Sequence, residues 1–283
     1  MVKVFDLVEL GESLNLMDVG AAAISEVPIY RSLIDLHMGK LHAFEGDRRQ
    51  IAGLVSTYGD QVSIFSDFLF DGTERDLYVA GAATGMTSLL RPSDRALKFF
   101  NGFEQFGEVR AVERVKTRRL DDIPELPLLD FVKLDIQGAE LTVLKNGVTK
   151  LRDCLAVQLE VSFVCLYENQ PPFGELDLWM RSQGYLPHCF LDVKRWSIAP
   201  TIFDGNFRIP GNQLLESDIV YIRNPLALEE LSSLQLAKFA ALSHYCFKSS
   251  DLCVHVLLEL VRRGELDGKV QEDYYNFLRR EGI

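Results

Sequence analysis

The sequence has few cysteines, and their placement argues against both a disulfide framework and a zinc site. There are five in 283 residues, an odd number, and no two of them form a C-x-x-C pair. Both kinds of site are normally recognised by an even set or by closely spaced pairs. We therefore expect these thiols to be small buried side chains: Cys154, Cys165, Cys189, Cys246 and Cys253.

Long apolar runs are also lacking. No segment approaches the roughly 20 uninterrupted apolar residues that cross a bilayer. The first twelve residues contain Asp6, Glu9 and Glu12 around only a short apolar run, which is not typical of a secretory signal peptide. We expect a cytoplasmic protein without a membrane span.

Positive charge is scarce as well. Lys and Arg number 30 against 41 Asp and Glu, giving a formal charge of −11. Nucleic acids are bound largely through Lys and Arg contacts to phosphate. The charge balance therefore argues against a nucleic-acid partner, whereas a cationic ligand is compatible with it.

The segments that are present alternate between short apolar strands and helices. Strands are predicted near residues 14–20, 40–45, 61–65, 130–135 and 155–161, with a last one at 218–223. A helical stretch that includes Ile24 is expected after the first strand, with its true start at about Pro28. Other helices are expected after Asp135, with Asn146-Gly147 as an internal break or cap, and over 173–183. Such alternation implies right-handed crossovers and a mostly parallel α/β sheet with helices on both faces.

Two regions depart from this alternation. Residues 81–107, between expected strands at 77–80 and 109–112, form a long loop, and such loops are usually functional. We expect a lid or substrate wall there. Residues 226–283 are largely helical, so we divide the chain into a domain of residues 1–225 and a C-terminal helical extension of 226–283. That extension packs on the sheet domain or on a second copy, which would give a homodimer.

Carboxylates stand at the ends of several predicted strands: Asp18, Glu45, Asp135 and Glu160. The carboxyl ends of parallel strands share one edge of the sheet, which is where ligands bind in α/β folds. One acid at a strand end is usually a solvated turn residue. Four at the same edge favour a site, because a buried acid is costly unless it is paired.

The segment with the most chemistry is Lys133-x-Asp135-x-x-Gly138-x-Glu140. Strand alternation puts Lys133 and Asp135 on one face, so we expect them to form an ion pair. A carboxylate at this strand end can orient or deprotonate a hydroxyl. We therefore predict Asp135, Glu160 and Lys133 as the catalytic residues, and the alternative for the pair is a purely structural role.

This segment resembles the signature of FkbM-family methyltransferases, which use S-adenosylmethionine to methylate hydroxyl groups, commonly on sugars or natural products. Residues 43–47 are similar to the family's A-F-E-P segment, with Gly46 in place of proline. Residues 18–21 are similar to the start of its D-V-G-A-N-x-G motif, but Ala22 replaces asparagine and Ile24 the second glycine. The resemblance covers residues 14–223 and implies a Rossmann-like class I methyltransferase fold with a seven-stranded sheet.

The resemblance also implies roles for the residues that would hold S-adenosylmethionine. Glu45 would accept hydrogen bonds from the ribose hydroxyls, as an acid at this strand end does in dinucleotide folds. The first motif would approach the carboxylate of the cofactor, and the residues after the third strand would contact the adenine or simply form a turn. The predicted cofactor-binding residues are Asp18, Gly20, Ala21, Glu45, Ser66 and Asp67. We predict no metal, since Asp135 and Glu160 alone supply too few oxygen ligands.

The leading hypothesis is an S-adenosylmethionine-dependent O-methyltransferase acting on a hydroxyl of a glycan, glycolipid or secondary metabolite. Residues 81–107, 187–217 and the helical tail would build the acceptor side. A second hypothesis is a catalytically inactive methyltransferase-like binding or interaction protein, suggested by Ala22 and Ile24. A nicotinamide-dependent oxidoreductase ranks third, because no G-x-G-x-x-G follows the first strand.

Overall fold

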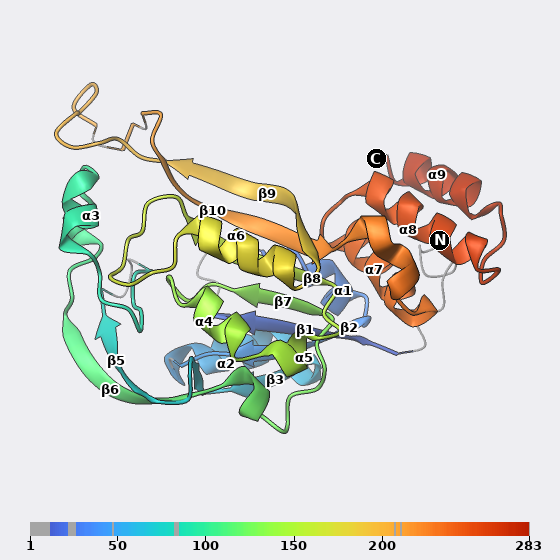
Figure 1. Cartoon of the computed structure of the whole chain (residues 1–283), viewed down its shortest axis with the longest axis horizontal. Coiled ribbons are helices and arrows are strands. Elements are labelled where there is room, and N and C mark those ends of the chain that lie inside the picture. Colours follow the sequence, from blue (N-terminus) through green and yellow to red (C-terminus); the bar gives the residue numbers. More distant parts are fainter. Residues whose placement is uncertain are drawn as a thin grey trace.

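A seven-stranded sheet runs through the computed structural model, which describes residues 12–21, 27–46, 48–81, 85–206, 208–209 and 211–282 (Figure 1). The strand order is β3-β2-β1-β7-β8-β10-β9, and β10 runs antiparallel to both its neighbours while the other pairs are parallel. The expected α/β fold is confirmed. The strands are β1 (Leu14–Val19), β2 (Gly39–Phe44), β3 (Val62–Phe65), β7 (Phe131–Leu134), β8 (Ala156–Ser162), β9 (Tyr185–Arg195) and β10 (Leu214–Arg223).

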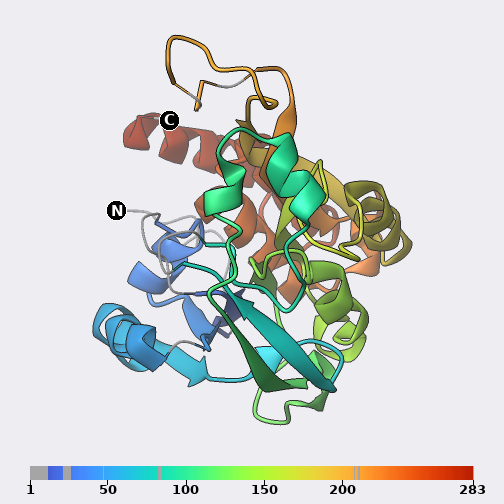
Figure 2. The same ribbon diagram turned by 90° about the vertical axis from the view of Figure 1, so that its left-hand side faces the viewer.

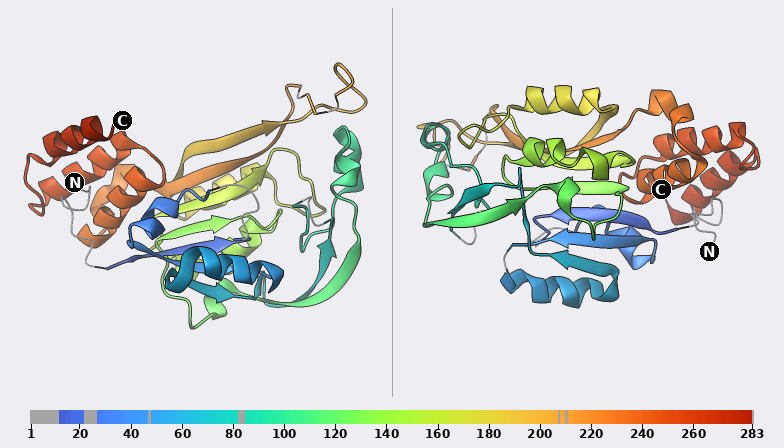
Figure 3. Two further views of the ribbon diagram at one scale, coloured as in Figure 1. Left: turned by 180° about the vertical axis from the view of Figure 1, so that it is seen from behind. Right: turned by 60° about the horizontal axis from the view of Figure 1, so that its bottom comes forward.

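Helices cover both faces of the sheet because each inner strand is apolar on both sides (Figure 3). In β1, Met17 and Val19 point to the face covered by α4 (Glu140–Lys145), α5 (Val148–Leu151) and α6 (Phe173–Ser182). Leu14 and Leu16 point to the opposite face, where α1 (Arg31–Asp35) packs. Helix α2 (Arg48–Tyr58) connects β2 to β3.

Two helix expectations have different outcomes. The predicted break at Asn146-Gly147 is present, between α4 and α5. A Cβ on Gly147 would lie 2.5 Å from Leu120, so the chain passes too close there for a larger residue. The helix expected from Pro28 is shorter than predicted, since only 31–35 are helical after a turn in which Arg31 N–H donates to Pro28 C=O. Ile24, expected on that helix, lies outside the described residues.

The region between β3 and β7 forms a second, three-stranded sheet of order β4-β6-β5. Its strands are β4 (Phe68–Leu69), β5 (Glu74–Val79) and β6 (Ala111–Arg118), so the strand expected at 109–112 starts later and is longer. The expected loop of 81–107 is wrong in part, because it contains α3 (Asp94–Phe99), whose first turn is capped by the Ser93 hydroxyl. Figure 1 shows α3 and the loop after β9 at the left-hand end of the molecule, which faces the viewer in Figure 2.

The C-terminal residues form α7 (Ser233–Tyr245), α8 (Ser250–Arg262) and α9 (Val270–Glu281), after a short turn at Pro225–Glu230. Helices α7 and α8 share one apolar cluster with Leu14, Leu16 and Phe131 of the sheet. They therefore cover the amino ends of the strands, at the end of the molecule opposite to α3 (Figure 1). The expectation that the helical tail builds the acceptor side is wrong, because the tail lies at the other edge of the sheet.

None of the helices in the described ranges combines the length and the apolar character that crossing a bilayer requires.

Candidate functional site

The four predicted strand-end carboxylates lie along one edge of the sheet. Asp18 is the last residue but one of β1, Glu45 and Asp135 directly follow β2 and β7, and Glu160 lies near the end of β8. The parallel register aligns Asp18 with Lys133 of β7. Because these strands are neighbours and run the same way, their acids collect at the carboxyl edge as predicted.

Lys133 links two of the carboxylates. Its Nζ lies 3.7 Å from Asp18 Oδ1 and 3.5 Å from Asp135 Oδ2, so the predicted Lys133–Asp135 ion pair is present. Burial lowers the pKa of Lys133, but the two carboxylates outweigh it and the pKa lies above its usual value. The ammonium therefore stays charged between the ends of β1 and β7.

Asp18 is the most buried of these acids, with 2% of its surface exposed. Burial raises its pKa, and Lys133 and the Tyr30 hydroxyl partly oppose that effect. Tyr30 donates to Asp18 Oδ2 at 2.5 Å, while Oδ1 accepts no hydrogen bond from the described residues. That oxygen instead faces the Lys133 ammonium at 3.7 Å, so Asp18 is held between Tyr30 and Lys133.

Gln137 connects Asp135 to Glu160, and the sequence pattern does not single it out. Its Nε2 donates to Asp135 Oδ1 at 3.0 Å and to Glu160 Oε2 at 2.8 Å, and its Oε1 accepts from the Tyr167 hydroxyl at 2.7 Å. Its φ of 58° lies in the left-handed region. The available signal is its place in the tight turn between β7 and α4, before Gly138.

Two further acids near this turn have perturbed pKa values. Burial raises the pKa of Glu140 to about 7, although its Oε1 accepts backbone N–H groups from Ile136 and Gly138. Burial, with the nearby Glu216 carboxylate, raises the pKa of Glu160 well above its usual value. A carboxyl group with a raised pKa is a stronger base once it is ionised.

Gly20 allows the ends of β1 and β7 to lie close together. Its φ is +82°, and a Cβ there would lie 2.5 Å from the Asp135 carbonyl oxygen. Any side chain would collide with backbone, so only glycine fits. Ala21 beside it is buried. Ala22 and Ile24, the two departures from the family motif, lie outside the described residues.

Glu45 continues the edge beyond β1. Its backbone N–H donates to Phe65 C=O at 2.9 Å, and 9% of its surface is exposed. Ser66 and Asp67 follow β3 beside it, but Ser66 is exposed whereas Asp67 is 3.2 Å from Arg118 Nη1. The structure thus brings Glu45 and the residues after β3 to one place, with Asp67 already in an ion pair.

A cavity of about 330 Å³ opens at the same edge, next to Glu160. Apolar and aromatic side chains line it together with four polar ones. The lining residues are Gly85, Met86, Phe103, Phe106, Gln137, Glu160, Leu166, Lys194, Trp196, Leu215 and Glu216.

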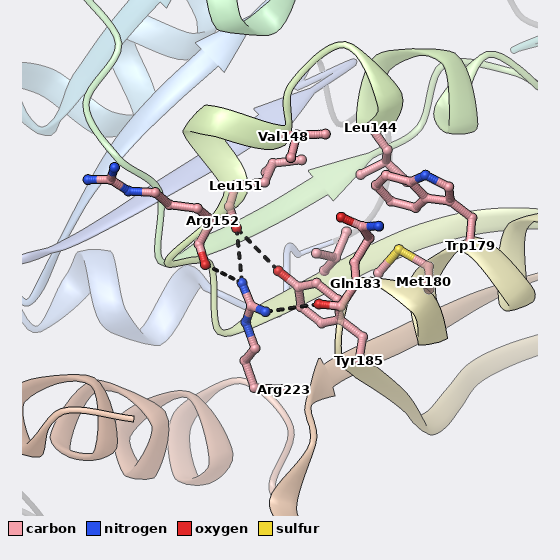
Figure 4. A pocket seen from close by; sticks show the side chains of 10 residues that line it. Leu144, Val148, Leu151, Arg152, Trp179, Met180, Gln183, Tyr185 and Arg223 are labelled. Atoms are coloured by element: carbon pink, nitrogen blue, oxygen red, sulfur yellow. Dashed lines mark hydrogen bonds between the residues drawn. The ribbon is translucent and has the colours of Figure 1, made fainter. Parts of the chain in front are cut away.

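A smaller hollow of about 160 Å³ lies between α4, α5 and α6, away from the carboxylates (Figure 4). Arg223 at its rim donates to the carbonyl oxygens of Leu151, Arg152, Cys154 and Gln183. Its guanidinium also lies 4.4 Å from the centre of the Tyr185 ring. These contacts satisfy helix-end carbonyls, so the role of Arg223 is structural.

Among the residues that the structure describes, no three His, Cys, Asp or Glu side chains are grouped so as to hold a metal ion.

Comparison with known proteins gives one family match. The methyltransferase FkbM domain matches residues 18–187. No curated protein matches the chain. Similar solved structures include precorrin-6y C5,15-methyltransferase from Geobacter metallireducens GS-15, with 12% identity over 78% of this chain and 85% of that chain and a TM-score of 0.35. Magnesium protoporphyrin IX methyltransferase (ChlM) from Synechocystis PCC 6803 with bound SAM has 12% identity over 78% of this chain and 76% of that one, with the same TM-score of 0.35.

Proposed function

The chain belongs to the FkbM family of S-adenosylmethionine-dependent methyltransferases, and from that premise we propose that it methylates a hydroxyl oxygen of a glycan, glycolipid or secondary metabolite. The observation that carries the proposal is the pair of carboxylates, Asp135 and Glu160, joined by Gln137 beside a cavity. A hydroxyl must lose its proton when it is methylated. A carboxylate within hydrogen-bond reach of the acceptor supplies the base for that loss.

The residues at the carboxyl edge fit the cofactor. The Glu45 carboxylate can accept both hydroxyls of a ribose, and Ser66 and Asp67 lie beside it for the adenine. Gly20, next to the buried Asp18, lets the backbone at the end of β1 come close to a ligand. When bound, S-adenosylmethionine supplies a methyl group on a positively charged sulfonium, which an edge rich in carboxylates accommodates.

Lys133 and Gln137 hold the acids of this site. Lys133 keeps Asp18 and Asp135 side by side as an ion-paired set, and its short distances to both fix the ends of β1 and β7. Gln137 spaces Asp135 from Glu160 with a neutral amide, so the two carboxylates do not repel at contact distance. The chain thereby orients an acceptor while keeping one acid available as a base.

Three related points stay predictions. The domain division at residues 225 and 226 is one, and a homodimer through the C-terminal helices is another. The inactive binding protein suggested by Ala22 and Ile24 is the third. It would be favoured by cofactor binding without methyl transfer to any acceptor.

Calorimetric titration with S-adenosylmethionine and S-adenosylhomocysteine tests the cofactor site. We expect Glu45→Ala to weaken binding of both by roughly 100-fold, because two hydrogen bonds to a charged acceptor are lost. Glu125→Ala is the matched control, since Glu125 is an exposed acid outside the carboxyl edge. Equal affinity of the two variants would overturn the role of Glu45, and no binding by the folded wild-type chain would overturn the site.

A further inference from the structure

The cavity beside Glu160 is built by two segments that the rest of the sheet does not need. One is the segment 85–107 between β5 and β6, which contributes Met86, Phe103 and Phe106. The other is the end of β9 and the residues that follow, which contribute Lys194 and Trp196. Both lie at the left-hand end of the molecule in Figure 1. Segments added at a ligand-binding edge usually carry specificity.

The segment 85–107 is hydrogen-bonded to the turn between β7 and α4 that contains Gln137. The Ser88 hydroxyl donates to the Gln137 carbonyl oxygen at 2.7 Å. Backbone hydrogen bonds also join Glu168 N–H to Arg91 C=O and Ser93 N–H to Leu166 C=O, both at 2.8 Å. The wall of the cavity therefore has a defined position relative to Asp135 and Glu160.

The second segment is fixed to the first. Trp196 Nε1 donates to Asn101 C=O at 2.8 Å, and Ala199 N–H donates to Phe99 C=O at 2.9 Å. The Phe103 and Trp196 rings meet edge to face, with centroids 5.0 Å apart, and Phe106 packs against Phe103 at 5.5 Å. The result is one aromatic wall made of residues about 90 positions apart in sequence.

The cavity is lined by more acidic side chains than basic ones. Among the described residues that line the cavity, Lys194 is the one cation, and its Nζ is 2.9 Å from Glu216 Oε1. Glu160 faces the same space with only the neutral Gln137 amide as its hydrogen-bond donor among the contacts above. A phosphate or carboxylate entering here would meet two acids and a lysine already in an ion pair. Such a lining disfavours anionic ligands.

We propose, resting on the proposed function, that this cavity is the acceptor site and that it selects a ring-shaped alcohol carrying no phosphate or carboxylate. The ring lies against the wall of Phe103, Phe106 and Trp196, and the reacting hydroxyl meets Glu160. The hydroxyl oxygen bonds to the methyl carbon as the carbon–sulfur bond breaks, the sulfur keeps the electron pair, and the Glu160 carboxylate takes the proton.

The geometry divides the roles of the two acids. Asp135 is ion-paired with Lys133 and is therefore a positioning group for Gln137 and the turn. Glu160 borders the cavity and is the base. Burial and the Glu216 carboxylate raise its pKa well above the usual value, which makes it a stronger base once it is ionised.

Tryptophan fluorescence offers a direct binding test, since the chain has two tryptophans and only Trp196 lines the cavity. Trp179→Phe leaves Trp196 as the reporter. The probes, added with saturating S-adenosylhomocysteine, are two matched series: methyl glucopyranoside with glucose 6-phosphate and glucuronate, and 4-hydroxybenzyl alcohol with 4-hydroxybenzoate. The series distinguish a sugar ring from a phenol ring.

We expect the neutral member of one series to change Trp196 fluorescence with at least tenfold higher affinity than its anionic partner. Tighter binding of the anionic partners would overturn the proposal. So would no response to any neutral member in a protein that binds S-adenosylhomocysteine. Loss of S-adenosylhomocysteine binding itself would instead count against the proposed function, so the two failures are distinguishable.

Two sets of variants test the aromatic wall and the proposed base separately. Phe106→Ala should weaken binding of the neutral probe about tenfold, whereas Tyr275→Ala, a half-exposed aromatic on α9, should not change it. Glu160→Gln should keep probe affinity within about threefold and lower methyl transfer to that probe by roughly 10² to 10⁴. Equal loss of affinity and transfer in Glu160→Gln would show a structural role and overturn its assignment as the base.

Discussion

At the scale of single residues, Gly46 is a position next to Glu45 where this chain departs from the family pattern. The family segment has proline where Gly46 stands. A Cβ at this position would lie 2.7 Å from the Phe68 ring. The glycine therefore makes room for Phe68, and the departure reflects local packing next to Glu45.

Gln137 is the residue that sequence reasoning does not reach. Its partners Glu160 and Tyr167 lie 23 and 30 positions away. A bond between side chains so far apart depends on the pairing of β7 with β8 and on the turn that puts Gln137 at a positive φ. Neither feature has a local pattern in sequence.

Glu140 gives a pH-dependent prediction at the residue scale. Its pKa in the folded chain is about 7 against an ordinary 4.5, so between these values the folded state binds more protons than the unfolded state. The free energy of unfolding therefore falls as pH rises from about 4.5 to 7, because over this range the unfolded chain has lost the proton that the folded chain keeps. We expect the wild type to lose, relative to Glu140→Gln, on the order of 3 kcal/mol across this range.

Urea unfolding at several pH values measures this difference. Glutamine suits the comparison because its Oε1 can still accept from Ile136 and Gly138. Parallel stability curves for the two proteins between pH 4.5 and 7 would contradict the assignment.

At the scale of elements, one buried ion pair attaches α7 to the sheet. Lys238 Nζ is 3.0 Å from Asp130 Oδ1 at the start of β7, and both side chains are less than a tenth exposed. Asp130 Oδ2 also accepts from Asn15 N–H of β1. The pair therefore connects the C-terminal helices to the two central strands.

Removing one partner of this pair should be costly. We expect Lys238→Met to destabilise the fold by about 3–5 kcal/mol, because Asp130 is left as a buried carboxylate without its counter-charge. Adding Asp130→Asn should recover part of that loss. A double-mutant cycle by urea unfolding gives the coupling. A coupling near zero would mean that the helix is held by apolar contacts alone.

At the scale of the whole molecule, the two ends of the parallel strands have different surroundings. The carboxyl edge holds the acids and the cavity, and the amino edge is covered by the C-terminal helices (Figure 1). Helix α7 is buried along nearly its whole length, from Leu236 to Tyr245. The apolar surface of α7 is thus covered by other parts of the same chain.

This arrangement predicts the behaviour of a truncated chain. Residues 1–225 alone would expose the apolar surface that Leu14, Leu16 and Phe131 share with α7 and α8. We expect this fragment to show no cooperative thermal unfolding and to bind hydrophobic dyes, whereas the full chain unfolds cooperatively. A cooperative fragment that binds S-adenosylhomocysteine would support two independent domains divided after residue 225.

The sequence by itself determined the alternating α/β fold, the edge at which the acids gather and the Lys133–Asp135 pair. These follow from strand periodicity and strand direction, which are local properties. Only the tertiary structure decided that Gln137 joins Asp135 to Glu160, that residues 85–107 and Trp196 form one wall, and that the tail covers the opposite edge. Each of these depends on contacts between segments far apart in the chain, whose partners no local pattern specifies.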